Sequence, residues 1–210
     1  MPDLEILAKE QEMLAKNVKR YDDPPNRGSI LTGVDVAYSE EYAVGHAIVI
    51  DNTTKEVINS ASVTKEIESD YIPGFFQLRE GPILIDLIKK LKTPGIVLVD
   101  GNGILHPRRF GLASYLGLKM DVQTIGVAKE LMLGSIGRKS GSAAPIIDQG
   151  EVIGKAVWAN RNRPIYVSIG HRVSLESSVN VVIESSVRGY PNVLRKAHIM
   201  SRTLLAEGGH

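Results

Sequence analysis

The chain of 210 residues contains no cysteine. This absence excludes disulfides, a thiolate nucleophile and a zinc site built on cysteine, and it suits a reducing compartment. Aromatic residues are also few, with 3 Phe, 7 Tyr and 1 Trp. A local concentration of them therefore needs a reason, and the segment YIPGFFQLRE, residues 71–80, holds three.

No long apolar run and no strong charge excess are present either. The first twenty residues, MPDLEILAKEQEMLAKNVKR, alternate charged and apolar residues and lack the apolar core and small-residue cleavage site of a signal peptide. No segment approaches membrane-spanning length. We expect a cytoplasmic protein without a membrane partner. The formal net charge is +1, so affinity for nucleic acid would have to come from a local basic surface.

The length and composition suit one globular domain over residues 1–210. The chain is 43% hydrophobic and 23% charged, which is ordinary for a folded protein. Asp3 is a candidate cap for a first helix, with Leu4, Leu7, Leu14 and Val18 on one side, and the DDPPNRG segment from Asp22 ends it.

Three strand patterns follow in ILTGVDVAYS, AVGHAIVI and EVINSASV, separated by short polar turns, which predicts an antiparallel meander. Next come a helix in PILIDLIKKLK, a strand in GIVLVDGNG, a helix in RRFGLASYLGLKM and a strand in VQTIGVA. A further strand pair is expected in PIIDQGEVIGKAV and RPIYVSIG, and helices in SLESSVNVVIESSV and NVLRKAHIMSRTLLA. Three antiparallel strands followed by β/α units predict an α/β fold, a mixed sheet of ribonuclease H-like architecture flanked by helices.

Three carboxylates lie where that architecture would bring them together. Asp35 is in the middle of the first strand, Asp100 ends the apolar strand IVLVD, and Glu80 opens or immediately precedes the helix after the meander. Converging carboxylates repel one another unless a cation lies between them, and Mg²⁺ prefers such oxygen ligands. A lone strand aspartate can equally serve in an ion pair or a turn, so the pattern alone leaves both interpretations open.

Five segments in order carry a resemblance to a known family: GVDVAYS, YIPGFFQLRE, VDGNGILHPRRFGLASYLG, QTIGVAKELMLG and LRKAH. Together they resemble endonuclease V, the deoxyinosine 3′ endonuclease family. The resemblance implies a ribonuclease H-like enzyme of DNA repair that uses Mg²⁺ or Mn²⁺. It also implies hydrolysis of the second phosphodiester bond 3′ to hypoxanthine in inosine-containing DNA. We expect a monomer.

The resemblance implies roles for individual residues. The catalytic residues would be Asp35, Glu80, Asp100 and His198, with Asp35 and Asp100 binding metal directly and Glu80 directly or through water. His198 would position or activate the attacking water. Without the family, a helix-surface histidine is the simpler interpretation.

The aromatic segment resembles the family's wedge, which enters the duplex where the lesion leaves the stack. The wedge would comprise Tyr71, Ile72, Pro73 and Gly74, and would offset the few kcal/mol needed to evert a base. Phe75 is expected to be core beneath it. Asp70 stands where the family often has proline, which would loosen the entry of the wedge.

The resemblance also implies a pocket for the base and a set of phosphate contacts. The pocket would be lined by Phe76, Gly101, Gly103, Gly111, Gly126 and Met132, with Gly74. Glycine backbone amides there would recognise the six-carbonyl of hypoxanthine and reject adenine; turn geometry alone also explains such glycines. The DNA contacts would be His106, Arg108, Arg109 and Lys129, with the two arginines at a helix start. Tyr115 stands where the family commonly has histidine, and that residue's role is not transferred to it.

Two other functions stay open on the sequence. Some members of the family prefer RNA, so an inosine-specific endoribonuclease is the first, and contact with a 2′-hydroxyl would distinguish it. A non-catalytic binder of damaged DNA is the second, although a binder has no use for clustered, mutually repulsive carboxylates. The phosphate-binding motifs GxxxxGK[ST] and GxGxxG do not occur in a suitable context.

Overall fold

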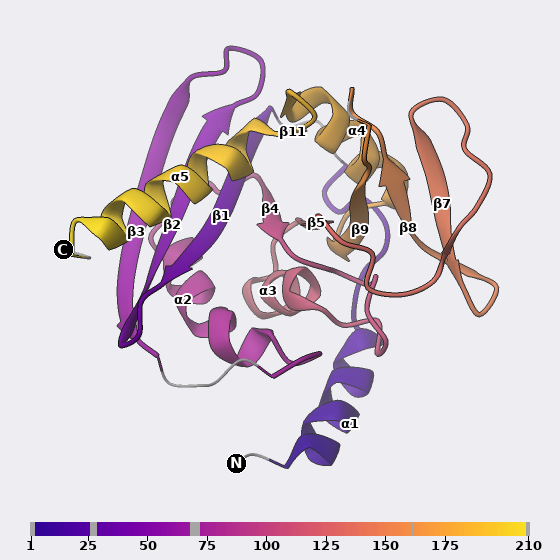
Figure 1. The fold of residues 1–210 in the computed structure, drawn as a ribbon, viewed down its shortest axis with the longest axis horizontal. Coiled ribbons are helices and arrows are strands. Elements are labelled where there is room, and N and C mark those ends of the chain that lie inside the picture. The colour runs from indigo at the N-terminus through magenta and orange to yellow at the C-terminus, as the bar shows by residue number, and fades with distance from the viewer. Residues whose placement is uncertain (1–2, 26–28, 68–71, 161, 209–210) are drawn as a thin grey trace.

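A mixed nine-stranded sheet runs through the molecule, with helices on both faces (Figure 1). The computed structural model describes residues 3–25, 29–67, 72–160 and 162–208. The strand order across the sheet is β3-β2-β1-β4-β5-β9-β8-β7-β6. Among the described residues, no helix combines the length and apolar character needed to cross a bilayer.

The first three strands form the predicted antiparallel meander. β1 pairs with β2 along its whole length, and β2 pairs with β3. β1 is also parallel to β4, which in turn is parallel to β5. The predicted order, a meander followed by β/α units, is thus confirmed. The strands are β1 (Ile30–Tyr38), β2 (Tyr42–Asp51), β3 (Val57–Glu66), β4 (Ile96–Asp100) and β5 (Thr124–Ala128).

The second half of the sheet is antiparallel. β5 pairs with β9, and β8 and β7 continue the sheet outward to the short β6. The sequence did not predict β6 or the separate two-stranded ribbon β10-β11, because two-residue strands leave no periodic pattern. These strands are β6 (Ser135–Ile136), β7 (Ala143–Asp148), β8 (Glu151–Val157), β9 (Ile165–His171), β10 (Ser186–Val187) and β11 (Tyr190–Pro191).

Five helices are described: α1 (Leu4–Ala15), α2 (Gln77–Lys89), α3 (Leu112–Met120), α4 (Leu175–Ser185) and α5 (Asn192–Ala206). Asp3 caps α1 as predicted, through the amides of Glu5 and Ile6. The helix ends at Ala15, well before Asp22. Leu4 is 45% exposed, whereas Leu14 packs partly buried against the core and Val18, just after the helix, is buried in it, so only the second half of the expected apolar side is packed.

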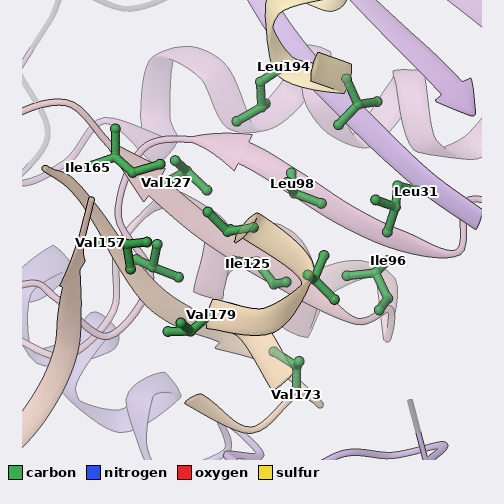
Figure 2. Packing of buried hydrophobic residues seen from close by; sticks show 14 of the residues in the cluster. Leu31, Ile96, Leu98, Ile125, Val127, Val157, Ile165, Val173, Val179 and Leu194 are labelled. Carbon is green, nitrogen blue, oxygen red and sulfur yellow. The ribbon is translucent and has the colours of Figure 1, made fainter. Parts of the chain in front are cut away.

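Alternation along the central strands divides the core into two layers. On β4, Ile96 and Leu98 face α4 and α5, whereas Val97 and Val99 face α2 and α3. Figure 2 shows the first layer, in which Leu98 lies near Leu31 of β1 and Leu194 of α5. Because β4 is buried on both faces, it reads as a continuous apolar run. The predicted fold class, a ribonuclease H-like mixed sheet flanked by helices, is confirmed.

Candidate active site

The four predicted catalytic side chains line one cavity of about 650 Å³. Asp35 comes from β1, Asp100 from the end of β4, Glu80 from α2 and His198 from α5. Since β1 and β4 are parallel neighbours, their carboxyl ends lie at the same edge of the sheet, where open α/β sheets hold ligands. The structure thus brings these four residues together, while the role of each stays a prediction.

Asp35 is held from α5. Ser201 Oγ donates to Asp35 Oδ2 at 2.5 Å, and His198 Nδ1 lies 3.2 Å from Oδ1. This contact depends on the close approach of α5 to β1 at Gly33. A Cβ on Gly33 would lie 2.5 Å from the backbone carbonyl of Val193, so a side chain there would push the helix away. Ser201 is buried and was missed by the sequence analysis.

Glu80 is buried in the first turn of α2, which begins at Gln77 instead of at Pro82 as the sequence suggested. The Tyr38 hydroxyl donates to Glu80 Oε1 at 3.0 Å, and the Arg79 guanidinium lies 4.2 Å from the centre of the Tyr38 ring. Burial raises the pKa of Glu80 to about 8, and the negative charges of Asp35 and Asp100 add to the rise. A cation that enters the cavity would favour the ionised form of Glu80 and lower its pKa again.

Asp100 is paired with a lysine from the next strand connection. Lys129, directly after β5, places its Nζ 2.6 Å from Asp100 Oδ2. The side chain of Lys129 is 56% exposed, so it can leave Asp100 without opening the core. The predicted position of Lys129 near the scissile phosphate stays a prediction; the structure shows its ion pair with Asp100, which lines the cavity.

The donor set suits a hard divalent cation. Three carboxylates line the cavity, and mutual repulsion of their charges contributes to the raised pKa of Glu80. Within the described ranges, no three His, Asp or Glu side chains are close enough to form a ligand cluster as they stand. Each carboxylate instead contacts a protein group. Asp35 contacts Ser201 and His198, Glu80 accepts from Tyr38, and Asp100 pairs with Lys129. Small side-chain shifts are therefore needed before the three act as ligands together.

A second cavity, of about 200 Å³, lies beside the first. Of the predicted base-pocket residues, Gly74, Phe76, Gly101, Gly111 and Met132 line it. Phe76 lines both cavities, and the consecutive residues Asp100 and Gly101 face one cavity each. Asn102, which the sequence analysis did not single out, lines the second cavity as well, and its Oδ1 is buried without a hydrogen-bond partner in the described structure.

Two glycines predicted for the pocket have packing roles instead. A Cβ on Gly103 would lie 1.9 Å from the Ile169 carbonyl oxygen, and one on Gly126 would lie 2.4 Å from the Gly103 nitrogen. The predicted use of glycine amides is also corrected. The amide of Gly103 donates to Ser168 Oγ, that of Gly101 to the Val127 carbonyl and that of Gly111 to the Gly103 carbonyl.

The HPRR segment is the largest correction to the predicted site. It forms a turn before α3, which begins at Leu112, and not the start of a helix. His106 is only 3% exposed and lies against the Gly74 carbonyl. Arg108 also donates to Gly74 O, at 2.7 Å, and Arg109 forms ion pairs with Asp148 and Glu151. These three side chains are engaged within the protein, so the structure does not support them as free phosphate contacts.

The predicted wedge is described only in part. Tyr71, like Asp70, lies outside the described residues. Ile72, Pro73 and Gly74 form a turn in which the Phe75 amide donates to the Ile72 carbonyl at 2.9 Å. Gly74 has a φ of +77°, a conformation that favours glycine. Phe75 is buried, which confirms its assignment to the core.

A further cationic residue lies at the first cavity. Arg202, one turn after His198 on α5, lines the first cavity, and its guanidinium has no hydrogen bond or ion pair with the described residues. A charged residue one helical turn from a candidate catalytic histidine was visible in the sequence but was not singled out.

Tyr115 packs against Phe110 and fills the space over Gly81, where a Cβ would lie 2.5 Å from the Tyr115 ring. Among the described residues, Tyr115 is not part of either cavity lining.

A meander followed by β/α units, with carboxylates gathered at the carboxyl ends of β1 and β4, defines a nuclease of the ribonuclease H-like class. The family model for endonuclease V matches residues 12–199. The chain belongs to the endonuclease V family, and it is therefore a DNA-binding phosphodiester hydrolase of DNA repair.

Individual relatives agree over nearly the whole chain. An endonuclease V from Thermofilum pendens is 37% identical over 209 residues, covering 98% of this chain and 90% of the relative. The crystal structure of an endonuclease V from Streptomyces avermitilis has a TM-score of 0.89 at 33% identity, covering 100% of this chain and 96% of that one. The Ciona intestinalis enzyme, crystallised with a 24-mer DNA containing an inosine followed by a ribo-adenosine, has a TM-score of 0.85 at 28% identity and covers 97% and 98%.

Proposed function

We propose that this enzyme recognises deoxyinosine in DNA and hydrolyses the second phosphodiester bond on its 3′ side. The observation that carries the proposal is the pair of adjoining cavities. One is lined by Asp35, Glu80, Asp100 and His198, and the other by glycines and apolar side chains together with Gln77, Asn102 and His106, a lining suited to a flat base with polar edges. Phe76 lines both, so a base in the second cavity would lie beside the carboxylates.

Asp35, Glu80 and Asp100 would hold the metal, with Mg²⁺ as the proposed ion and Mn²⁺ as a substitute. A divalent ion held there would supply an activated water and stabilise the leaving oxygen. Asp35 orients His198 through Nδ1, which leaves Nε2 for a hydrogen bond to water. The Tyr38 hydroxyl holds Glu80 in place. Arg202 and Lys129 are the cations at the cavity suited to backbone phosphates.

The base pocket needs a donor that distinguishes hypoxanthine from adenine. Because the amides of Gly101, Gly103 and Gly111 are engaged within the protein, that discrimination falls to other groups of the second cavity. The Asn102 side chain, which lines the second cavity, is the polar group that we propose for recognising the base. Its amide nitrogen lies 3.9 Å from Met132 Sδ, a weak contact that a base could replace.

One observation supports RNA as a second candidate substrate. The DNA bound to the Ciona intestinalis relative carries a ribo-adenosine directly after the inosine. A 2′-hydroxyl at that place is therefore compatible with a structurally similar site. Whether this chain prefers RNA to DNA depends on its contacts to the 2′-hydroxyl.

The proposal is tested with labelled duplexes and single strands of DNA and RNA that contain one inosine, in Mg²⁺ or chelator, with the cut position mapped. We expect metal-dependent cleavage of the bond that joins the 3′ neighbour of the lesion to the next nucleotide, which is the second phosphodiester bond. Asp100→Asn removes a metal-binding charge at constant size, so turnover should fall by a factor on the order of 1,000 or more while inosine binding persists. The matched control is Asp86→Asn on the far part of α2, which pairs with Lys65. Near-normal cutting by Asp100→Asn would contradict the site assignment.

A further inference from the structure

Helix α1 contributes one buried side chain to the molecule, and that side chain is polar. Gln11 is 2% exposed, whereas Ile6 and Met13 of the same fully described helix are 64% and 67% exposed. A surface helix ordinarily buries an apolar stripe. A buried amide persists only when its hydrogen-bonding groups are satisfied. Leu14 and Ala15 pack only partly buried against the core, so the most buried contacts of α1 are those of Gln11.

The Gln11 amide joins three segments that are far apart in the chain. Its Nε2 donates to the Gly74 carbonyl at 3.2 Å and to the Phe110 carbonyl at 3.3 Å. Its Oε1 accepts from Arg108 Nε. The amide thus connects α1 with the turn before α2 and with the turn before α3. In Figure 1, α1 lies beneath these two connections.

Gln11, Arg108 and His106 all donate to the carbonyl oxygen of Gly74. Arg108 Nη2 lies 2.7 Å from this oxygen, and His106 Nε2 lies 3.2 Å from it. The Arg108 amide donates to His106 Nδ1, so the proton of the neutral ring is on Nε2, facing Gly74. Burial and the Arg108 charge lower the pKa of His106 to about 4, which keeps this ring neutral.

The anchored carbonyl belongs to the turn formed by residues 72–76, here named the recognition turn. Gly74 lines the second cavity together with His106, and Phe76 of the same turn lines both cavities. The Arg108 guanidinium also covers the Phe75 ring at 4.3 Å. A Cβ on Gly74 would lie 2.9 Å from Arg108 Nη2, so the contact leaves no room for a side chain. The recognition turn is therefore held by His106, which lines the second cavity, and by Gln11 and Arg108, which line neither cavity.

We propose that Gln11 is a positioning residue for substrate recognition: through Gly74, and with Arg108 and His106, it holds the recognition turn in the conformation that shapes the second cavity. The effect on the substrate rests on the proposed function, because it supposes that the second cavity receives the base. Gln11 is remote from the carboxylate cavity. Its loss should therefore weaken binding of inosine substrates and leave the chemical step almost unchanged.

The test replaces Gln11 by Leu, which keeps the size and removes both donors and the acceptor. Met13→Ala, on an exposed position of the same helix, is the matched control. In the free protein, hydrogen exchange of the amides of residues 74–79 should be about tenfold faster in Gln11→Leu than in the control, as expected for the loss of one or two buried hydrogen bonds. KM for an inosine-containing duplex should rise about fivefold to tenfold, with kcat within about twofold of the parent.

Gln11→Glu is a second variant in case Gln11→Leu folds poorly. It keeps an acceptor for Arg108 but has no donor for Gly74, so it should show the same faster exchange. Unchanged exchange at residues 74–79 in both variants, with only a lower melting temperature, would overturn the proposal, because Gln11 would then be a stability residue. If the parent shows no preference for inosine, the proposed function fails, and the exchange result alone still decides whether Gln11 positions the turn.

Discussion

At the residue scale, each acid of the candidate site is stabilised by a different kind of partner. Asp35 accepts from a buried serine hydroxyl, Glu80 from a tyrosine hydroxyl, and Asp100 from a lysine ammonium. A buried carboxylate without such donors would be strongly unfavourable. For Glu80, burial raises the pKa although the hydrogen bond from Tyr38 opposes the rise. The donors therefore stabilise the carboxylates, whereas burial makes the Glu80 carboxyl retain its proton until a cation enters.

His106 provides a pH test of the recognition turn. Its pKa is lowered from 6.5 to about 4, first by burial and then by the charge of Arg108. A group with a depressed folded-state pKa contributes stability that is fully present above 6.5 and is lost as the pH falls toward 4. Over this window the parent should lose on the order of 3 kcal/mol more of its free energy of unfolding than His106→Gln, measured by urea denaturation.

Glutamine at position 106 keeps an N–H near Gly74 and cannot titrate. His46 and His171, whose pKa values are also lowered by burial, are present in both proteins, so their contributions cancel in the difference. Parallel stability curves for parent and variant between pH 6.5 and 4 would contradict the buried, neutral state of His106.

At the residue scale, the sequence predicted which residues form the candidate site, but not the distant partners of their side chains. The convergence of Asp35, Glu80, Asp100 and His198 was predictable, because the order of the elements predicts which strands are neighbours and the family motifs mark these residues. The partners of Arg109 were not, since Asp148 and Glu151 come from the β7-β8 hairpin about forty residues later in the chain. Two adjacent arginines suggested a phosphate-binding pair. In the structure, Arg109 instead forms ion pairs with residues that are distant in the sequence.

At the element scale, α5 is the helix that delivers side chains to the site. Ser201 and Arg202 follow His198 by three and four residues, which places both on the same side of the helix as His198. The expected architecture makes β1 and β4 neighbours. The structure confirms this, because the two strands pair in parallel from Leu31 with Ile96 to Val34 with Val99. The closeness of α5 depends on Gly33, and a single glycine in a strand does not identify the helix that will lie over it.

Arg202 tests whether α5 also contacts the substrate backbone. Arg202→Ala should weaken binding to inosine-bearing and plain DNA by similar factors, because phosphate contacts carry no base information. The slope of log affinity against log salt concentration should fall by about one unit. Fluorescence anisotropy over a salt series measures both. The control is Arg195→Ala on the same helix, whose guanidinium donates to the Val187 carbonyl.

A loss confined to inosine-bearing DNA would contradict this role for Arg202. It would instead indicate that the guanidinium recognises the base or the distorted strand around it. An equal loss of affinity and an equal fall in the salt slope in Arg195→Ala would show that α5 contributes only general positive charge.

At the scale of the whole molecule, a net charge of +1 conceals a concentrated negative cluster. Three carboxylates share a cavity of about 650 Å³. Two exposed cations lie beside them: Arg202 lines the same cavity, and Lys129 pairs with Asp100. The order of elements allowed the fold to be predicted, because a meander followed by β/α units has few sheet topologies. The two cavities were less predictable, since their walls combine loops whose contacts are set by tertiary packing.

Metal binding should therefore be measurable as stability of the entire chain. A ligand that binds only the folded state stabilises it by about 2.7 kcal/mol at a hundred times its Kd, which for a chain of this size raises the melting temperature by roughly 5 to 10 °C. We expect such a rise with Mg²⁺ in the parent, measured by scanning calorimetry without substrate. Asp35→Asn and Asp100→Asn should lose most of it, because each removes one of the converging charges. Asp86→Asn, whose carboxylate pairs with Lys65 away from the cavity, should retain it. Equal Mg²⁺-induced shifts in the parent and in both site variants would place the ion elsewhere on the molecule, since the folded state would then gain the same binding energy with the converging charges removed.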